Sequence, residues 1–129
     1  MKSLEDLEKA FDRGLDAWEQ DIVEKHAKKM AKKAVREVKR KTPIQSGNLR
    51  RRWDGRTEKR SDGADIILTN DADYAAPVNN GHRIVNRGKT TGYKEGHHML
   101  EKGIAAYQDT YMKDDLQDMV DELGKRMKG

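Results

Sequence analysis

The chain has few of the residues that build a large or cross-linked protein interior. Its 129 residues include no cysteine, two prolines and one phenylalanine. Without cysteine there is no disulfide, thiolate metal site or cysteine nucleophile. No apolar run approaches the roughly 20 residues that a membrane-spanning helix needs, and the opening residues MKSLED lack the apolar stretch of a signal peptide. We therefore expect a soluble, intracellular protein.

Apolar side chains are also scarce for one domain of this length. Only 34% of the residues are hydrophobic, whereas 39% are charged, and a short chain already has an unfavourable ratio of surface to volume. The apolar residues nevertheless recur in regular patterns, which argues against disorder. We expect a small core, protruding elements, or burial that other subunits complete.

The net charge of +4 conceals a strong segregation of charge along the chain. Residues 25–60 contain fifteen Lys or Arg and only three acids, whereas residues 109–122 contain six acids and a single Lys. Such segregation indicates either that the basic part binds nucleic acid or that the two parts of the protein meet each other.

A long helix is predicted over residues 3–41. Ser3 is a suitable N-cap, and apolar residues recur at steps of three and four, namely Leu4, Leu7, Phe11, Leu15, Trp18 and Ile22. Thr42 precedes Pro43 and so avoids helical backbone angles, which ends the helix. An unbroken helix of this length would measure roughly 58 Å. It therefore either projects from the domain or breaks, and Gly14 is its weak point.

The remaining elements are predicted from turn signals and periodicity. We expect a β-hairpin over 49–71 with its turn at Asp62-Gly63, an irregular loop with short strands over 72–97 and a second helix over 98–127. In that helix the apolar stripe is displaced around the axis after Tyr111. The order predicts one α+β domain over 1–129, with a long N-terminal helix, a small mostly antiparallel β-sheet and a C-terminal helix packed on the sheet.

Three short blocks carry a family resemblance: TPIQSGNL at 42–49, YAAPVNNGHR at 74–83 and GHHMLEKG at 96–103. Together they resemble the T-P-x-x-[ST]-G-x-L, Y-x-x-x-V-x-x-G and G-x-x-[FM]-L blocks of the tailed-phage minor tail, head–tail joining and tail-completion family. The matching positions are Thr42, Pro43, Ser46, Gly47, Leu49, Tyr74, Val78, Gly81, Met99 and Leu100. The chain departs from the pattern at His98, where many relatives have proline, and at Asn79-Asn80, where relatives often have an acid.

The same blocks have a physical interpretation that needs no relatives. Pro43 stops the helix, and Ser46-Gly47 lets the chain reverse, since glycine tolerates a positive φ. Leu49 then starts a strand that packs on the helix. Residues that define a turn in this way have structural roles without any partner.

The resemblance implies a structural virion protein of a tailed phage or prophage. It implies a homo-oligomeric ring, with a hexamer as the expected size, that joins or completes the tail at the head–tail interface. Its implied partners are copies of itself, the neighbouring connector, and tail-tube or terminator proteins, with DNA passing through without sequence-specific binding. The implied location is the host bacterial cytoplasm during assembly and then the neck or tail of the virion. No enzyme activity, cofactor or metal is implied.

Charge supplies a hypothesis for the subunit contacts. Basic and acidic elements are expected to meet, within a subunit or between neighbours, and complementary charge then sets register and specificity. The candidate contact residues are Lys32, Arg36, Arg50, Arg52, Trp53, Asp114, Asp115 and Asp118. The candidate residues for meeting the next ring or lining the channel are His82, Arg83, Arg87 and Lys89.

Two alternatives come from different functional classes. Non-specific nucleic-acid binding would use the basic surface from Lys25 to Arg60, with Trp53 as a stacking surface. A metal-dependent hydrolase would use His82, His97 and His98, although the adjacent pair lacks the helical i, i+4 spacing of zinc-protease motifs. No phosphate-binding loop, nucleophile elbow or HExxH motif is present in the sequence.

Overall fold

A computed structural model describes residues 2–43, 47–73, 75–86 and 89–128. In chain order its elements are α1 (Leu4–Arg13), α2 (Ala17–Lys41), α3 (Gly47–Arg51), β1 (Trp53–Arg60), β2 (Gly63–Asn70), α4 (Ala75–Asn80), β3 (Gly81–Asn86), β4 (Lys89–Glu95), α5 (Met99–Tyr107), the π-helical turn η1 (Gln108–Met112) and α6 (Lys113–Lys128). The predicted α+β class is confirmed, although the strands form two separate two-stranded antiparallel sheets.

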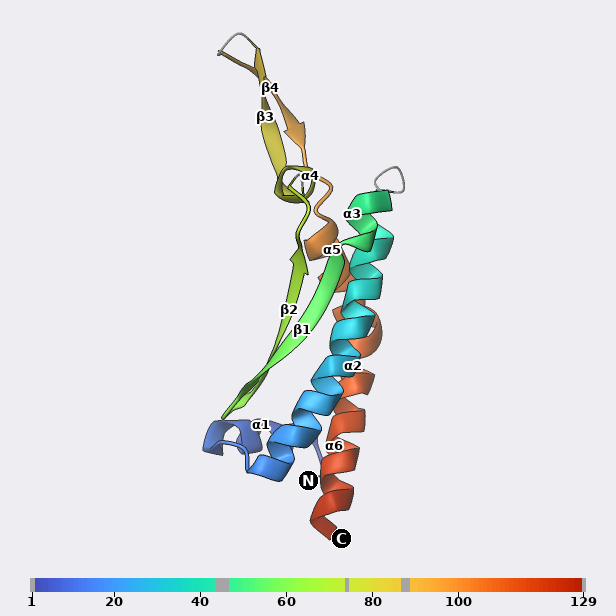
Figure 1. Cartoon of the computed structure of the whole chain (residues 1–129). Helices are drawn as coiled ribbons and strands as arrows, with labels where there is room; N and C mark the ends of the chain where they lie inside the picture. Colours follow the sequence, from blue (N-terminus) through green and yellow to red (C-terminus); the bar gives the residue numbers. More distant parts are fainter. Residues whose placement is uncertain (1, 44–46, 74, 87–88, 129) are drawn as a thin grey trace.

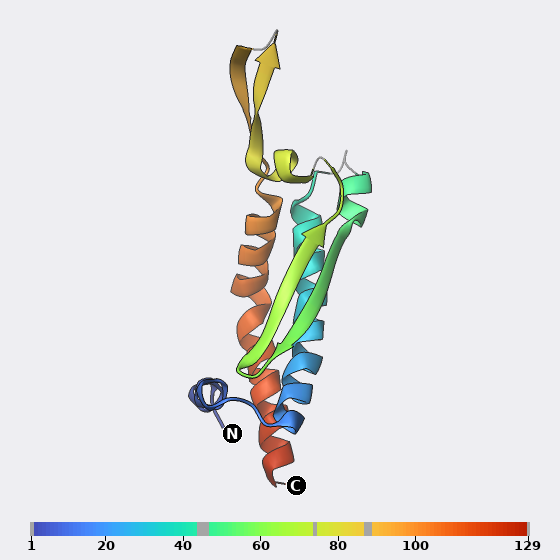
Figure 2. The same cartoon turned by 60° about the vertical axis from the view of Figure 1, so that its left-hand side comes forward.

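Two long helical segments run antiparallel and form the body of the molecule. One is α2 and the other is the continuous run α5–η1–α6, and the β1–β2 hairpin lies across one face of the pair (Figures 1 and 2). The core is divided into three small clusters along α2, centred on Ile22 and Leu123, on Met30 and Tyr107, and on Val38. This elongated interior agrees with the low apolar content.

The predicted helix over 3–41 is wrong as a single element, because it breaks at Gly14. Gly14 has φ 87°, a left-handed value that glycine adopts without a Cβ clash. The next backbone N–H, that of Leu15, donates a 2.6 Å hydrogen bond to the carbonyl of Ser61. The break turns α1 away from α2, so Leu4 and Trp18 of the predicted apolar stripe are exposed.

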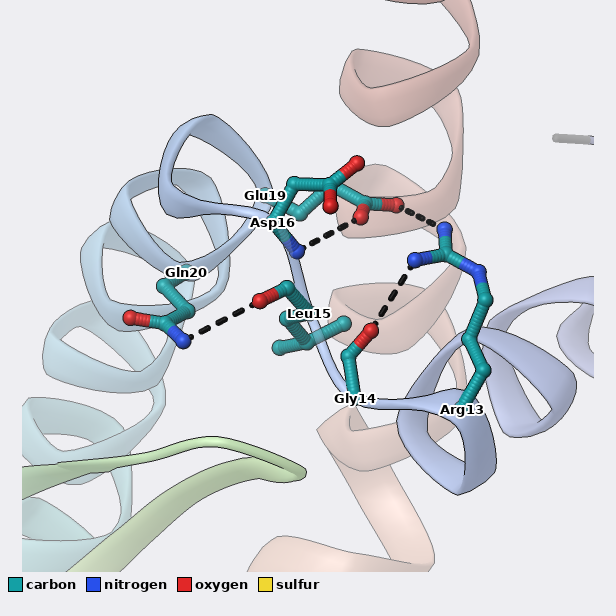
Figure 3. A network of polar contacts seen from close by, with 6 residues as sticks. All are labelled: Arg13, Gly14, Leu15, Asp16, Glu19 and Gln20. Carbon is teal, nitrogen blue, oxygen red and sulfur yellow. Dashed lines mark hydrogen bonds and ion pairs between the residues drawn. The ribbon is translucent and has the colours of Figure 1, made fainter.

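A buried carboxylate, that of Glu19, holds the corner between α1 and α2 (Figure 3). Its Oε2 accepts a 2.7 Å hydrogen bond from Arg13 Nη2, and its Oε1 accepts a 3.0 Å bond from the backbone N–H of Asp16. Arg13 Nη1 also donates to the carbonyl of Gly14 at 2.9 Å. Burial alone would raise the pKa of Glu19, but the hydrogen bonds from Arg13 and Asp16 outweigh it and the pKa is lowered.

The end of α2 is tied to the start of β1. Thr42 Oγ1 donates to the carbonyl of Val38 at 2.9 Å and accepts a 2.9 Å hydrogen bond from the indole N–H of Trp53. Leu49, on the short helix α3, is fully buried in the same cluster as Val38. The prediction that Leu49 starts a strand is therefore wrong, because one helical turn buries it and the strand begins at Trp53.

The β1–β2 hairpin and α5 both approach α2 closely at glycines. The predicted hairpin is present, with Trp53 opposite Asn70, but its two-residue turn is Ser61-Asp62, one residue before the predicted Asp62-Gly63, and is closed by Arg60 and Gly63. A Cβ added at Gly55 would lie 2.8 Å from Val35 Cγ2, and one added at Gly103 would lie 2.5 Å from the Cα of Val38. These glycines set the distance between the elements.

Of the predicted irregular loop with short strands over 72–97, the short strands are confirmed as β3 and β4, whereas the irregular loop is wrong, because the two strands pair as a hairpin and the helix α4 precedes them. Gly81 pairs with Glu95, and the register shifts between Ile84 and Val85. The hairpin extends beyond the helical body along the long axis of the molecule (Figure 1). The sequence predicted short strands here but not that they pair with each other, since glycines and the shifted register interrupt the two-residue period.

Candidate functional site

The basic helix α2 and the acidic helix α6 meet within the subunit along a line of ion pairs, which we call the seam. Lys25 Nζ lies 2.6 Å from Glu122 Oε1, and His26 Nε2 lies 3.3 Å from Glu122 Oε2. Further along, Lys33 Nζ lies 2.6 Å from Asp115 Oδ1. The hydrogen bond from Lys25 lowers the pKa of Glu122. The segregated charges of the sequence therefore pair partly within one chain.

A buried tyrosine adds a third partner to the seam. The Tyr107 hydroxyl donates a 2.8 Å hydrogen bond to Asp115 Oδ2, so this carboxylate binds Tyr107 and Lys33 at once. Burial, and then the bond to Asp115, raises the pKa of Tyr107. The rings of Tyr107 and Tyr111 stack with centroids 6.2 Å apart, and Lys33 Nζ lies 5.4 Å from the Tyr111 centroid.

The π-helical turn η1 brings these groups to one face. The second helix over 98–127 is present, but residues 108–112 form a π turn within it. A π turn inserts one extra residue into an α-helix. Two residues eight positions apart across this turn, such as Tyr107 and Asp115, therefore lie as residues seven positions apart lie in a regular α-helix. Seven residues are about two helical turns. The displaced stripe after Tyr111 was the sequence signal of this turn.

Charged residues remain open on each side of the seam. The basic stripe consists of Lys29, Lys32 and Arg36 on α2, and the acidic stripe consists of Asp114, Asp118 and Asp121 on α6; all six are exposed. Among the described residues, neither stripe forms a salt bridge, although the guanidinium of Arg36 lies 6.0 Å from the Tyr111 ring centroid. A hollow of about 530 Å³ separates Lys32 from Asp118.

The structure separates the predicted contact residues into two groups. Lys32, Arg36, Asp114 and Asp118 lie on the open stripes. The others are arranged differently: Asp115 is buried in the seam, Arg50 Nε donates to the Lys39 carbonyl at 3.0 Å, and Arg52 Nη1 lies 3.0 Å from Asp71 Oδ1.

Trp53 was predicted as a contact or stacking surface, and that prediction is wrong. The side chain is 7% exposed and its indole N–H is bound to Thr42. A tryptophan at the start of a strand beside a buried threonine fills the core. Sequence reasoning also missed Lys33, Tyr107 and Glu122, because only the fold pairs residues that lie so far apart in the chain.

The blocks of the family resemblance lie around the far end of the helical body. Met99 is fully buried with Leu49, and Val78 and Leu100 pack against the same cluster. Thr42 is buried, Pro43 is half-buried and Gly81 begins β3. Gly47 begins the short helix α3 and does not use the positive φ that glycine tolerates. Ser46 and Tyr74 lie outside the described residues.

Asn79, noted above as a departure from the family pattern, links α4 to α5. Its Oδ1 accepts a 2.9 Å hydrogen bond from the backbone N–H of Leu100, and its carbonyl accepts one of 2.9 Å from that of His98. His98 has φ 49° and its side chain does not cap the helix, so Asn79 supplies the cap from outside. Asn79 Nδ2 also donates to Glu101 Oε1 at 3.1 Å.

The candidate loop residues His82, Arg83 and Lys89 lie on the β3–β4 hairpin, and Arg87 is outside the described residues. Among the described side chains, no group of three His, Asp or Glu is placed to hold a metal ion. Within the part of the chain that the structure describes, no helix combines the length and apolar character needed to cross a bilayer.

Comparison with known proteins identifies a family. The model described as "Bacteriophage HK97-gp10, putative tail-component" matches residues 4–81, from α1 to the first residue of β3. The match covers more than half of the chain and leaves the third block, at 96–103, beyond its end. No curated protein and no solved structure matches the chain. The chain therefore belongs to the HK97-gp10-like family of bacteriophage tail components.

Proposed function

We propose that this tail component forms a homo-oligomeric ring, with a hexamer as the expected size, that joins or completes the tail at the head–tail interface. The observation that carries the proposal is the pair of open stripes on opposite sides of the seam. Intramolecular pairing uses Lys25, Lys33, Asp115 and Glu122 and leaves both stripes unpaired among the described residues.

The arrangement of the stripes favours a head-to-tail contact between copies. A copy placed beside another in the same orientation brings its α6 toward the α2 of the first, so an acidic stripe faces a basic stripe. Such heterologous contacts close into rings when the rotation between copies permits it. Complementary charges then select the register and oppose wrong partners, and their contribution falls as salt rises.

Charge reversal tests this contact with an internal control. Chains with Lys29→Glu and Lys32→Glu, or with Asp114→Lys and Asp118→Lys, are each expected to remain monomeric by light scattering after size exclusion. An equimolar mixture should assemble again, because each variant then meets its complement. Self-association should weaken about tenfold or more in each variant alone. Assembly of both variants at wild-type concentrations would contradict the proposal.

The β3–β4 hairpin is our candidate for meeting the next ring or lining the channel. It extends beyond the helical body (Figure 2) and carries His82, Arg83 and Lys89. Contacts of the ring with connector, tube or terminator proteins are part of the same proposal.

Non-specific nucleic-acid binding is the second candidate, favoured by the open basic stripe. The burial of Trp53 removes the predicted stacking surface, so this binding would rest on phosphate contacts alone and would fall steeply with salt. A gel-shift titration on duplex DNA distinguishes the two. Reversal of Asp114 and Asp118 should abolish the ring yet preserve or strengthen DNA binding.

A further inference from the structure

An apolar groove runs beside β2 on the side of α5, η1 and α6. Two hollows of about 280 and 450 Å³ share Met30, Ile66 and Met112 in their walls, so they form one continuous groove. The rest of the lining is mainly apolar: Leu68, Leu100, Ile104 and Tyr107 toward α5, and Phe11, Ala64, Leu116 and Met119 toward α6. A continuous apolar groove on a chain with so few apolar residues indicates a contact surface.

The groove is bordered by a free strand edge. The sheet has the order β1–β2, and no other described strand pairs with β2. Because Arg60 and Gly63 close a two-residue turn, the backbone polar groups of every second residue from Gly63 face β1. The N–H and C=O groups of Ala64, Ile66 and Leu68 therefore point to the open edge, beside the groove that these residues line.

We propose that this groove receives the β3–β4 hairpin of a second copy, with one of its strands paired to the free edge of β2. The inference rests on the proposed function, which supplies further copies. Because the hairpin extends along the long axis of the molecule (Figure 1), the copy that supplies it is one displaced along that axis, as in a second ring, and not the copy placed beside it. Strand addition to an open edge provides backbone hydrogen bonds, and the groove provides pockets for alternate side chains.

Two features favour the hairpin as the occupant. It extends beyond the helical body (Figures 1 and 2), and an isolated two-stranded hairpin is only marginally stable in water, so a second sheet edge would stabilise it. The edge from Ala64 to Leu68 is about 16 Å long, and a strand of the length of β3 spans about 20 Å, so one strand of the hairpin covers this edge.

The absence of native cysteine makes disulfide trapping a direct test. A chain carrying Ile104→Cys in the groove is mixed with a chain carrying either Ile84→Cys or Arg83→Cys in β3, under mild oxidation. Successive side chains of a strand point to opposite faces. A strand paired to the edge of β2 turns only one of its faces into the groove, so one of these two β3 positions should give a mixed disulfide in several-fold higher yield than the other.

The outcomes separate this inference from the proposed function. Equal yields at both β3 positions, or no mixed disulfide in a sample that light scattering finds to be oligomeric, would overturn the hairpin contact alone. A disulfide from Ile104→Cys to Leu4→Cys in its place would assign the groove to α1 of the neighbour and overturn it too. A protein that is monomeric throughout would overturn the ring and the hairpin contact together.

Lysine substitutions at one position inside the groove and one position outside it give a second, independent readout. Ile104 lines the groove, whereas Ile67 points to the other face of β2, and both are half-buried. Ile104→Lys should weaken self-association about tenfold or more, since docking would bury its charge, while Ile67→Lys should leave it unchanged. Thermal unfolding followed by circular dichroism establishes that each variant folds. Equal effects of the two substitutions would contradict the proposal.

Discussion

The hydroxyl of Tyr107 donates a 2.8 Å hydrogen bond to Asp115, eight residues further along the same helical run. A regular α-helix would turn two residues eight positions apart by about 80° from each other, and the π turn between Tyr107 and Asp115 brings them closer to one line. The same carboxylate pairs with Lys33 of α2. One carboxylate therefore connects the π turn to the long basic helix.

Removal of the Tyr107 hydroxyl should lower the free energy of unfolding. Tyr107→Phe deprives the buried Asp115 of a donor, so we expect a loss of about 1–3 kcal/mol in the free energy of unfolding. Tyr111→Phe is the matched control, since the Tyr111 hydroxyl has no hydrogen bond among the described residues, and it should cost less than about 0.5 kcal/mol. Urea unfolding followed by circular dichroism measures both. Similar losses in the two variants would count against the role given to Asp115.

Acid should weaken the corner between α1 and α2. The pKa of Glu19 is lowered in the folded protein from its ordinary value of 4.5. The folded state therefore binds fewer protons than the unfolded state near that pH. The resulting stabilisation is present above about pH 4.5 and is lost as pH falls through the folded pKa. Free energies of unfolding measured between pH 7 and pH 3 should decline less steeply for Glu19→Gln than for the unaltered protein.

The close contact of α5 with α2 predicts an intolerant glycine. Gly103→Ala would place a methyl 2.5 Å from the Cα of Val38, which is backbone and cannot rotate away. The helices must then separate, at an expected cost of about 1–3 kcal/mol. Gly47→Ala is the control, because among the described residues its methyl would meet the flexible end of Arg51 at 3.4 Å and no backbone atom. Thermal melts should separate the two variants, and a Gly103→Ala protein as stable as the unaltered one would refute the contact.

Thr42 is predicted to act through its hydroxyl. Thr42→Val removes the acceptor of the buried Trp53 indole N–H at nearly constant volume, so stability should fall by about 1–3 kcal/mol. Thr42→Ser retains the hydroxyl and should lose less. Tryptophan fluorescence during urea unfolding measures the change. A loss in the Ser variant as large as that in the Val variant would contradict the leading role given to the hydroxyl.

Features encoded by neighbouring residues were predictable from the sequence. Ser3 accepts a 3.3 Å hydrogen bond from the backbone N–H of Asp6, as its capping role requires. The Thr42-Pro43 stop also lies where the local signals place it, and the turn of the β1–β2 hairpin falls one residue before the predicted one. In each case the determining interactions join residues only a few positions apart.

Features that depend on distant residues were not predictable. Gly14 was recognised as a weak point, but the break is fixed by the bond from Leu15 to Ser61 in the hairpin turn. The strand pattern gave no sign that Trp53 faces Thr42 rather than a partner. Which of the charged residues pair within the chain also follows only from the position of α6 against α2. The basic and acidic stripes consist of charged residues that take no part in this pairing. Their contact with a neighbouring copy stays a prediction.

The central claim is that this tail component assembles with copies of itself through complementary charge. Sedimentation velocity of the unaltered protein, over a hundredfold range of concentration at low and high salt, tests it most directly. We predict one discrete species at a whole-number multiple of the 14.8 kDa chain mass, whose formation weakens as salt rises. A monomer at every concentration and salt level would contradict the claim.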